Sequence, residues 1–143
     1  DKMNKTKELP NEEERNILYF ASLYAGFALN KGGTGFPHGM GYALTEDFNI
    51  PHGLACVVFL PQYLKEAEKA NPVLYKELMD TMNTDFDALN TLFNDFCAFD
   101  FAVSDEQIAS YVERWSTLKN FKNSPTDFNN EDAGILVQKL FQK

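Results

Sequence analysis

Helix-start signals recur along this chain of 143 residues, and no segment shows the sustained alternation of apolar and polar residues that is typical of a half-buried strand. A length of this order suits one domain. The helices are expected over 11–31, 37–45 and 51–60, with a restart at 61 towards 70, then from 71, from 85, over 105–119 and from 130. The sequence therefore predicts an all-α protein: residues 1–10 form a flexible arm, and residues 11–143 form one helical-bundle domain of about seven helices.

The first predicted helix, 11–31, has apolar residues over more than half of its circumference, so we expect it to be deeply buried. Asn11 can cap this helix, and three glutamates follow in its first turn, where the helix dipole favours negative charge. The glycine-rich stretch 32–35 then interrupts the helical pattern. No strand precedes this stretch, and its spacing matches neither nucleotide-binding fingerprint, so a turn between helices is favoured over a phosphate-binding loop.

The overall charge and the two cysteines limit the classes of partner and compartment. Thirteen basic and twenty-one acidic residues give a net charge of −8, which disfavours nucleic acid as a partner. Cys56 and Cys97 lie in apolar runs, so we expect two buried free thiols in a reducing cytoplasm, with a single disulfide as the alternative. The longest apolar run, 54–60, is far shorter than the ~20 residues that span a bilayer, and the polar start predicts no signal peptide.

The segment 36–61 contains the only two histidines of the chain, His38 and His52. Each lies in the tripeptide Pro-His-Gly, and fourteen positions separate them. Proline fits the first positions of a helix, so each histidine is expected in a first helical turn. Each following glycine leaves room for a second body, such as a metal or a ligand, to approach closely.

Two imidazoles on neighbouring helix starts predict half of a metal site, since neutral imidazole binds zinc, iron, nickel or copper. The alternative is that both rings only cap helices or donate hydrogen bonds to carbonyls. Glu46 and Asp47 lie between the two motifs and could complete a site, although solvated turn residues are the default interpretation for both.

The sequences HGMGY from His38, IPHG from Ile50 and FLP from Phe59 together resemble the signature of the iron-dependent alcohol dehydrogenases. That family has His-x-Met-x-His, a second Pro-His-Gly at the same spacing of fourteen, and an apolar run ending in Leu-Pro. Dehydroquinate synthases and glycerol dehydrogenases share its two-domain plan but differ in histidine spacing. The resemblance covers most of the chain, and its specificity is concentrated in residues 36–61.

The resemblance implies that this chain corresponds to the all-helical C-terminal domain of a dehydroquinate synthase-like two-domain enzyme. The metal, Fe(II) or Zn(II), would have His38 and His52 as two of its four ligands and would act as a Lewis acid on the oxygen of an alcohol or aldehyde. NAD(P) would bind mainly to an N-terminal domain that this sequence does not contain, and hydride exchange belongs to that cofactor. The family's upstream Asp and His ligands are also absent, so the chain alone is expected to be inactive. A homodimer is one arrangement of the complete enzyme.

Tyr42 occupies the position where many members of the family have a further histidine, and it is therefore the candidate catalytic residue. Its phenol can donate a hydrogen bond, but a pKa of about 10 makes it a poor proton shuttle at neutral pH. Ordinary helix packing is the alternative role. Phe36, Met40 and Phe48 are candidates for lining a small substrate pocket, with core packing as their alternative.

Three functions follow from these observations. The leading hypothesis is the metal-binding domain of an alcohol dehydrogenase that interconverts alcohols and aldehydes. The second is a helical structural or interaction module with no bound metal. The third is a stand-alone metal hydrolase, which would need a carboxylate ligand from this chain, such as Asp47.

Overall fold

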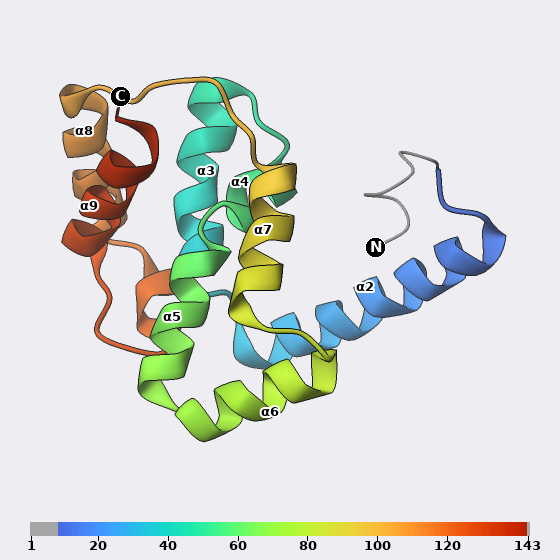
Figure 1. Ribbon diagram of the computed structural model, residues 1–143. Coiled ribbons are helices and arrows are strands. Elements are labelled where there is room, and N and C mark those ends of the chain that lie inside the picture. Colours follow the sequence, from blue (N-terminus) through green and yellow to red (C-terminus); the bar gives the residue numbers. More distant parts are fainter. Residues whose placement is uncertain (1–8, 143) are drawn as a thin grey trace. The chain divides into compact units, whose positions relative to one another are not determined.

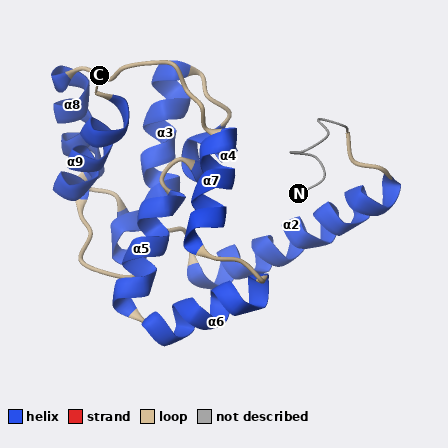
Figure 2. Ribbon diagram, in the orientation of Figure 1, coloured by secondary structure: helices blue, strands red, loops and turns tan. Residues whose placement is uncertain are grey.

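The computed structural model describes residues 9–142, and the chain divides into two compact units, Asp1–Gly33 and Thr34–Lys143. Every regular element in the described part is a helix, and no strand occurs there (Figure 2). The helices are α2 (Glu12–Gly32), α3 (Phe36–Phe48), α4 (His52–Val57), α5 (Leu60–Ala70), α6 (Pro72–Met82), α7 (Phe86–Phe96), α8 (Asp105–Trp115), the 3-10 helix η1 (Lys119–Asn123) and α9 (Asn130–Phe141) (Figure 1). The prediction of an all-α fold is confirmed.

The first unit contains one helix among its described residues, α2. Asn11 caps this helix as the sequence predicts, and the structure adds a full capping box: the Asn11 side chain accepts from the backbone N–H of Glu14, and the Glu14 carboxylate accepts from that of Asn11. The prediction that this helix is deeply buried is wrong for the chain as described, because none of its residues is buried. No second helix of its own unit is described that could cover its apolar side chains. The predicted arm falls largely on residues 1–8, which lie outside the described residues.

The second unit is built around a continuous apolar core. Phe36 and Phe128 stack in it with ring centroids 4.2 Å apart, and the only tryptophan, Trp115, is 1% exposed. Figure 1 shows α8 beside α9 and α3 beside α4, and these pairs make the most extensive helix contacts of the unit. The buried side chains of this core are Phe36, Met40, Ala43, Leu44, Ile50, Ala55, Phe59, Val103, Tyr111, Trp115, Phe128, Ala133, Val137 and Phe141.

Most helix starts of this unit agree with the capping residues in the sequence. Asn71, Asp85 and Ser104 cap α6, α7 and α8, each by accepting a hydrogen bond from a backbone N–H of the first turn. The cap of α9 is Asn129, one residue before the expected start. The predicted helix over 51–70 is divided between α4 and α5, because Pro61 fits the second position of a new helix and cannot continue the previous one.

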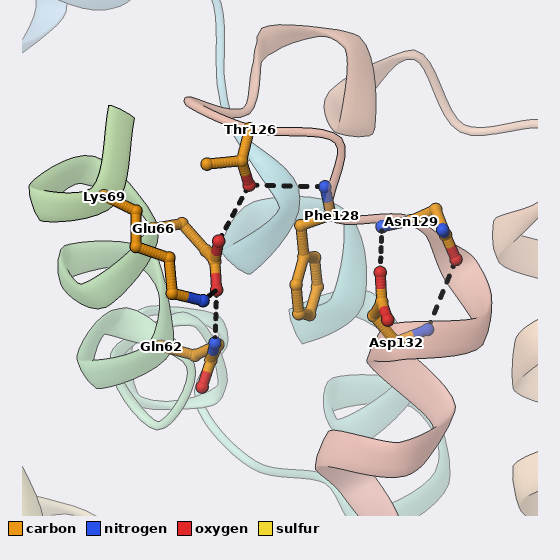
Figure 3. A network of polar contacts seen from close by, with 7 residues as sticks. All are labelled: Gln62, Glu66, Lys69, Thr126, Phe128, Asn129 and Asp132. Carbon is orange, nitrogen blue, oxygen red and sulfur yellow. Dashed lines mark hydrogen bonds and ion pairs between the residues drawn. The ribbon is translucent and has the colours of Figure 1, made fainter. Parts of the chain in front are cut away.

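A buried carboxylate links α5 to the segment before α9 (Figure 3). Glu66 is 5% exposed, and its oxygens accept hydrogen bonds from Gln62 at 2.7 Å, Lys69 at 2.8 Å and Thr126 at 2.8 Å. Burial alone would raise the pKa of this carboxyl, but the three donors outweigh burial and hold the pKa below its usual value. The network therefore stabilises the packing of these two segments.

Both cysteines are free and partly buried, so the predicted thiols are confirmed, although neither is fully buried. Within residues 9–142, no helix combines the length and apolar character needed to cross a bilayer.

Candidate metal centre

His38 is the third residue of α3, and His52 is the first residue of α4. Pro37 lies in the first turn of α3, and Pro51 is the N-cap of α4. Both histidines therefore lie in first helical turns, as the two Pro-His-Gly motifs predict. Asn49 ends α3 in the left-handed conformation, with φ 53° and ψ 32°, so that the chain reverses between the two helices.

The two imidazole rings meet edge to face. Their Nε2 atoms lie 3.4 Å apart, their centroids are separated by 4.7 Å, and their planes are inclined at 85°. Two nitrogens bound tetrahedrally at 2.0–2.1 Å from zinc would lie about 3.3 Å apart. The separation of these two atoms therefore matches that of two ligands of one ion.

Tyr42 lies one helical turn after His38 and stacks on His52. The ring centroids of Tyr42 and His52 are 4.5 Å apart at an angle of 27°, and the Tyr42 ring also meets His38 edge-on at 5.1 Å. The side chain is exposed, with 44% of its surface accessible. Tyr42 therefore covers one side of the two histidine rings and is itself exposed to solvent.

Thr45 contacts the other ring nitrogen of His52. Its Oγ1 lies 3.2 Å from His52 Nδ1 and 3.0 Å from the carbonyl oxygen of Gly41. Cys56, one turn after His52 on α4, places its Sγ 3.6 Å from His52 Nε2. Sequence reasoning missed both residues. The signal was present for Thr45, because residues 38, 42 and 45 follow the spacing i, i+4, i+7 and share one helix face.

Burial favours the neutral forms of two of these groups. Burial and the neighbouring His52 both lower the pKa of His38, so its imidazole is neutral at pH 7. Burial raises the pKa of the Cys56 thiol, so it carries its proton at neutral pH. Neutral imidazole is the form that binds metal ions.

The glycines of this segment differ in what they accommodate. A Cβ on Gly39 would approach Leu118 Cδ1 to 2.9 Å and Asn120 Oδ1 to 3.0 Å. The space left by this glycine is therefore occupied by side chains in and next to η1. A Cβ on Gly53 would meet nothing within 4 Å. Gly41 was not singled out from the sequence, yet its Cβ would lie 2.9 Å from Cys56 Sγ and 3.2 Å from two backbone atoms of α4. Gly41 therefore sets how closely α3 and α4 approach.

The acidic residues between the motifs interact with α8. Asp47 accepts a hydrogen bond from the Tyr111 hydroxyl, and Glu46 pairs with Arg114 at 2.7 Å. Within residues 9–142, no group of three or more His, Cys, Asp or Glu side chains is arranged to hold a metal ion. The third hypothesis, a stand-alone metal hydrolase with Asp47 as a ligand, therefore has no geometric support in the described part.

The three candidate substrate-lining residues lie in or against the core. Phe36 and Met40 have no exposed surface. Phe48 is partly buried and stacks on Phe101 with centroids 4.0 Å apart. Core packing, the alternative role considered for these three residues, describes their contacts in this chain.

The fold and the site define an all-helical unit in which two imidazoles from consecutive helices present converging nitrogens. Comparison with known proteins agrees with this description. The sequence model of the Fe-containing alcohol dehydrogenase family, C-terminal part, matches residues 2–132. The chain belongs to the iron-containing alcohol dehydrogenase family.

Individual relatives carry related names. The chain is 33% identical over 82 residues to 1,3-propanediol dehydrogenase of Citrobacter freundii, a match that covers 57% of this chain and 21% of the relative. It is 26% identical over 136 residues to the aldehyde-alcohol dehydrogenase of Clostridium acetobutylicum, covering 92% of this chain and 15% of the relative. It is 28% identical over 88 residues to the NADPH-dependent butanol dehydrogenase of Clostridium saccharobutylicum, covering 59% and 23%.

These matches cover from 15% to 23% of the length of the relatives, so the chain corresponds to a minor part of each of them. No solved structure was found to match the chain.

Proposed function

We propose that His38 and His52 supply two ligands of a divalent metal, Fe(II) or Zn(II), in the C-terminal domain of an alcohol dehydrogenase. The observation that carries this proposal is the 3.4 Å separation of their Nε2 atoms, which fits two ligands of one tetrahedral ion. A bound metal of this kind supplies Lewis acidity towards the oxygen of an alcohol or aldehyde. The remaining ligands would come from outside this chain.

The chemistry of the complete enzyme is proposed as an NAD(P)-linked interconversion of small alcohols and aldehydes. The relatives named for propanediol and butanol support a small alcohol as the substrate class. A nicotinamide cofactor, which supplies hydride exchange, would bind mainly to an N-terminal domain. The chain alone is proposed to be inactive, and the cytoplasm remains the proposed compartment because both thiols are free.

The residues of this chain would hold and position the reactants. Tyr42 lies beside both rings and is exposed, so its hydroxyl would donate a hydrogen bond to the substrate oxygen. Of the proposed substrate-lining residues, Phe48 is only partly buried, so part of its ring would be open to a substrate. Phe36 and Met40 are fully buried and would line a substrate pocket only if that pocket formed against the core. These roles are proposals that rest on the family resemblance.

The second candidate is a helical interaction module without a metal. It is favoured by the same 3.4 Å contact, which also fits a long hydrogen bond between two neutral imidazoles. In that case the histidine pair would have a structural role only.

Zinc titration followed by NMR distinguishes the two functions. In the metal-binding case, zinc shifts the Nε2 resonances of both histidines together, and either His38→Ala or His52→Ala abolishes the shift at the remaining ring. Affinity for this chain alone is expected to be weak, because two imidazoles are fewer than the three or four protein ligands of a typical zinc site. Adding the cofactor-binding domain of the natural protein should then create a tight site and alcohol-dependent turnover.

The interaction module predicts a different outcome. Zinc at millimolar concentration would leave both Nε2 resonances in place, or would shift them independently. Full metal occupancy and unchanged turnover in either alanine variant of the complete enzyme would also reject the metal-binding function.

A further inference from the structure

We infer that Thr45 is a positioning residue: it determines which ring nitrogen of His52 carries the proton, so that the lone pair on Nε2 of His52 faces His38. For its relevance to metal binding, this inference rests on the proposed function. Its geometric basis, however, is independent of any bound metal.

The inference begins with the two contacts of one hydroxyl group. Thr45 Oγ1 lies 3.0 Å from the Gly41 carbonyl oxygen and 3.2 Å from His52 Nδ1. The carbonyl oxygen can only accept, so a hydrogen bond to it uses the single proton of the Thr45 hydroxyl. Threonine commonly makes this bond to the carbonyl four residues earlier in a helix.

The Thr45 oxygen must then act as an acceptor towards His52. A hydrogen bond at this contact requires that Nδ1 of His52 carry the proton. In neutral imidazole only one nitrogen is protonated, so Nε2 then holds the lone pair. Of the two neutral tautomers of His52, only this one makes both contacts of Thr45 hydrogen bonds.

The other side of the ring is consistent with the same assignment. His52 Nε2 faces Nε2 of His38 at 3.4 Å and Sγ of Cys56 at 3.6 Å. A thiol S–H is a weak hydrogen-bond donor, and the Cys56 Sγ lies within reach of this nitrogen. A lone pair at His52 Nε2 can therefore accept a hydrogen bond while no metal is bound, and it has the form required of a metal ligand.

Thr45 also restricts the orientation of the ring. It lies on the same face of α3 as His38, and its hydroxyl is fixed to the helix backbone at Gly41. The ring of His52 is thus held between Thr45 on one edge and the His38 and Cys56 side on the other. Outer-shell partners of this kind typically change metal affinity by about 10–100-fold when they are removed.

The direct test is the tautomer of His52 in the metal-free chain, read from ¹⁵N chemical shifts and long-range ¹H–¹⁵N correlations at about pH 8. We expect a protonated Nδ1 and an unprotonated Nε2 in the wild type. Thr45→Val removes the hydroxyl at nearly constant shape and should shift the population towards the Nε2–H form. Thr45→Ser keeps the hydroxyl and should restore the wild-type pattern. An Nε2–H tautomer in the wild type overturns the inference, and this measurement requires no variant to fold.

Zinc titration of the same three proteins supplies the second readout. Thr45→Val should weaken zinc binding by about 10-fold or more, and Thr45→Ser should bind within a few-fold of wild type. Equal tautomer populations and equal affinities in wild type and a folded Thr45→Val would refute the role of Thr45. If the wild type shows the expected tautomer but zinc does not perturb either ring, the proposed metal function fails and the positioning of His52 by Thr45 stands.

Discussion

Replacement of Gly41 by alanine should separate the two helices that hold the histidines. The added Cβ would lie 2.9 Å from Cys56 Sγ, 3.2 Å from the Ala55 carbonyl carbon and 3.2 Å from the Cys56 nitrogen. Two of these three atoms belong to the backbone of α4, which cannot move aside as a flexible side chain can. Overpacking of this kind typically costs about 1–3 kcal/mol.

The expected loss is partly offset by helix propensity, because alanine is favoured over glycine within a helix by about 1 kcal/mol. Gly53→Ala provides the matched control, since it adds the same methyl group to the adjacent helix where no atom lies within 4 Å. We therefore expect Gly41→Ala to be less stable than Gly53→Ala by about 1–3 kcal/mol. Zinc should also bind more weakly to Gly41→Ala, because the two rings would no longer meet at the observed separation.

Urea unfolding followed by tryptophan fluorescence measures this difference. Trp115 is the only tryptophan and is 1% exposed in the core of the Thr34–Lys143 unit, so its emission reports on the unit that contains both histidines. If Gly41→Ala proves as stable as Gly53→Ala and binds zinc as the wild type does, then the close approach at Gly41 does not control the spacing of α3 and α4.

Three further predictions concern other contacts. Glu66→Gln should lower the unfolding free energy by about 1–3 kcal/mol at pH 7. Because the folded-state pKa of Glu66 is lowered, this contribution is present above about pH 4.5 and should disappear as the pH falls through the folded-state pKa. Urea unfolding at low pH tests this: a difference in stability between wild type and Glu66→Gln that stays the same there would contradict the prediction. Burial and the hydrogen bond to Asp47 raise the pKa of Tyr111 in the folded state, so the wild type should lose stability as the pH rises above about 10. Tyr111→Phe should lose less stability over the same pH range, and thermal melts at several pH values measure the difference. Tyr42→Phe in the complete enzyme should lower kcat by about 10²-fold with little change in metal content, because it removes one hydrogen-bond donor to the reacting oxygen, and wild-type turnover would reject the proposed role of Tyr42.

The helix starts could be predicted from the sequence because a cap depends on a few adjacent residues. Ser104 and Asp85 needed only their own first turns to be recognised. The burial of α2 could not be predicted in the same way. Periodicity shows which of its side chains are apolar, whereas their burial depends on another segment that covers them.

The histidine pair could be predicted because both residues lie in one short segment with a repeated motif. Contacts between segments far apart in the sequence could not be predicted in this way. The partners Asp47 and Tyr111 are 64 positions apart, and nothing in either local sequence indicates the other. Thr45 is an intermediate case, since its position on the face of His38 was available from the spacing but its bond to His52 required the turn at Asn49.

The pairing of His38 and His52 has a consequence for how the site forms during folding. The two rings are separated by fourteen positions, and a single reversal of the chain at Asn49 brings them together. Closing so short a loop has a small entropic cost, and local contacts of this kind form early relative to contacts between distant segments. The pair of histidines should therefore assemble as α3 and α4 form a local hairpin of helices, before α8 and α9 complete the surrounding core.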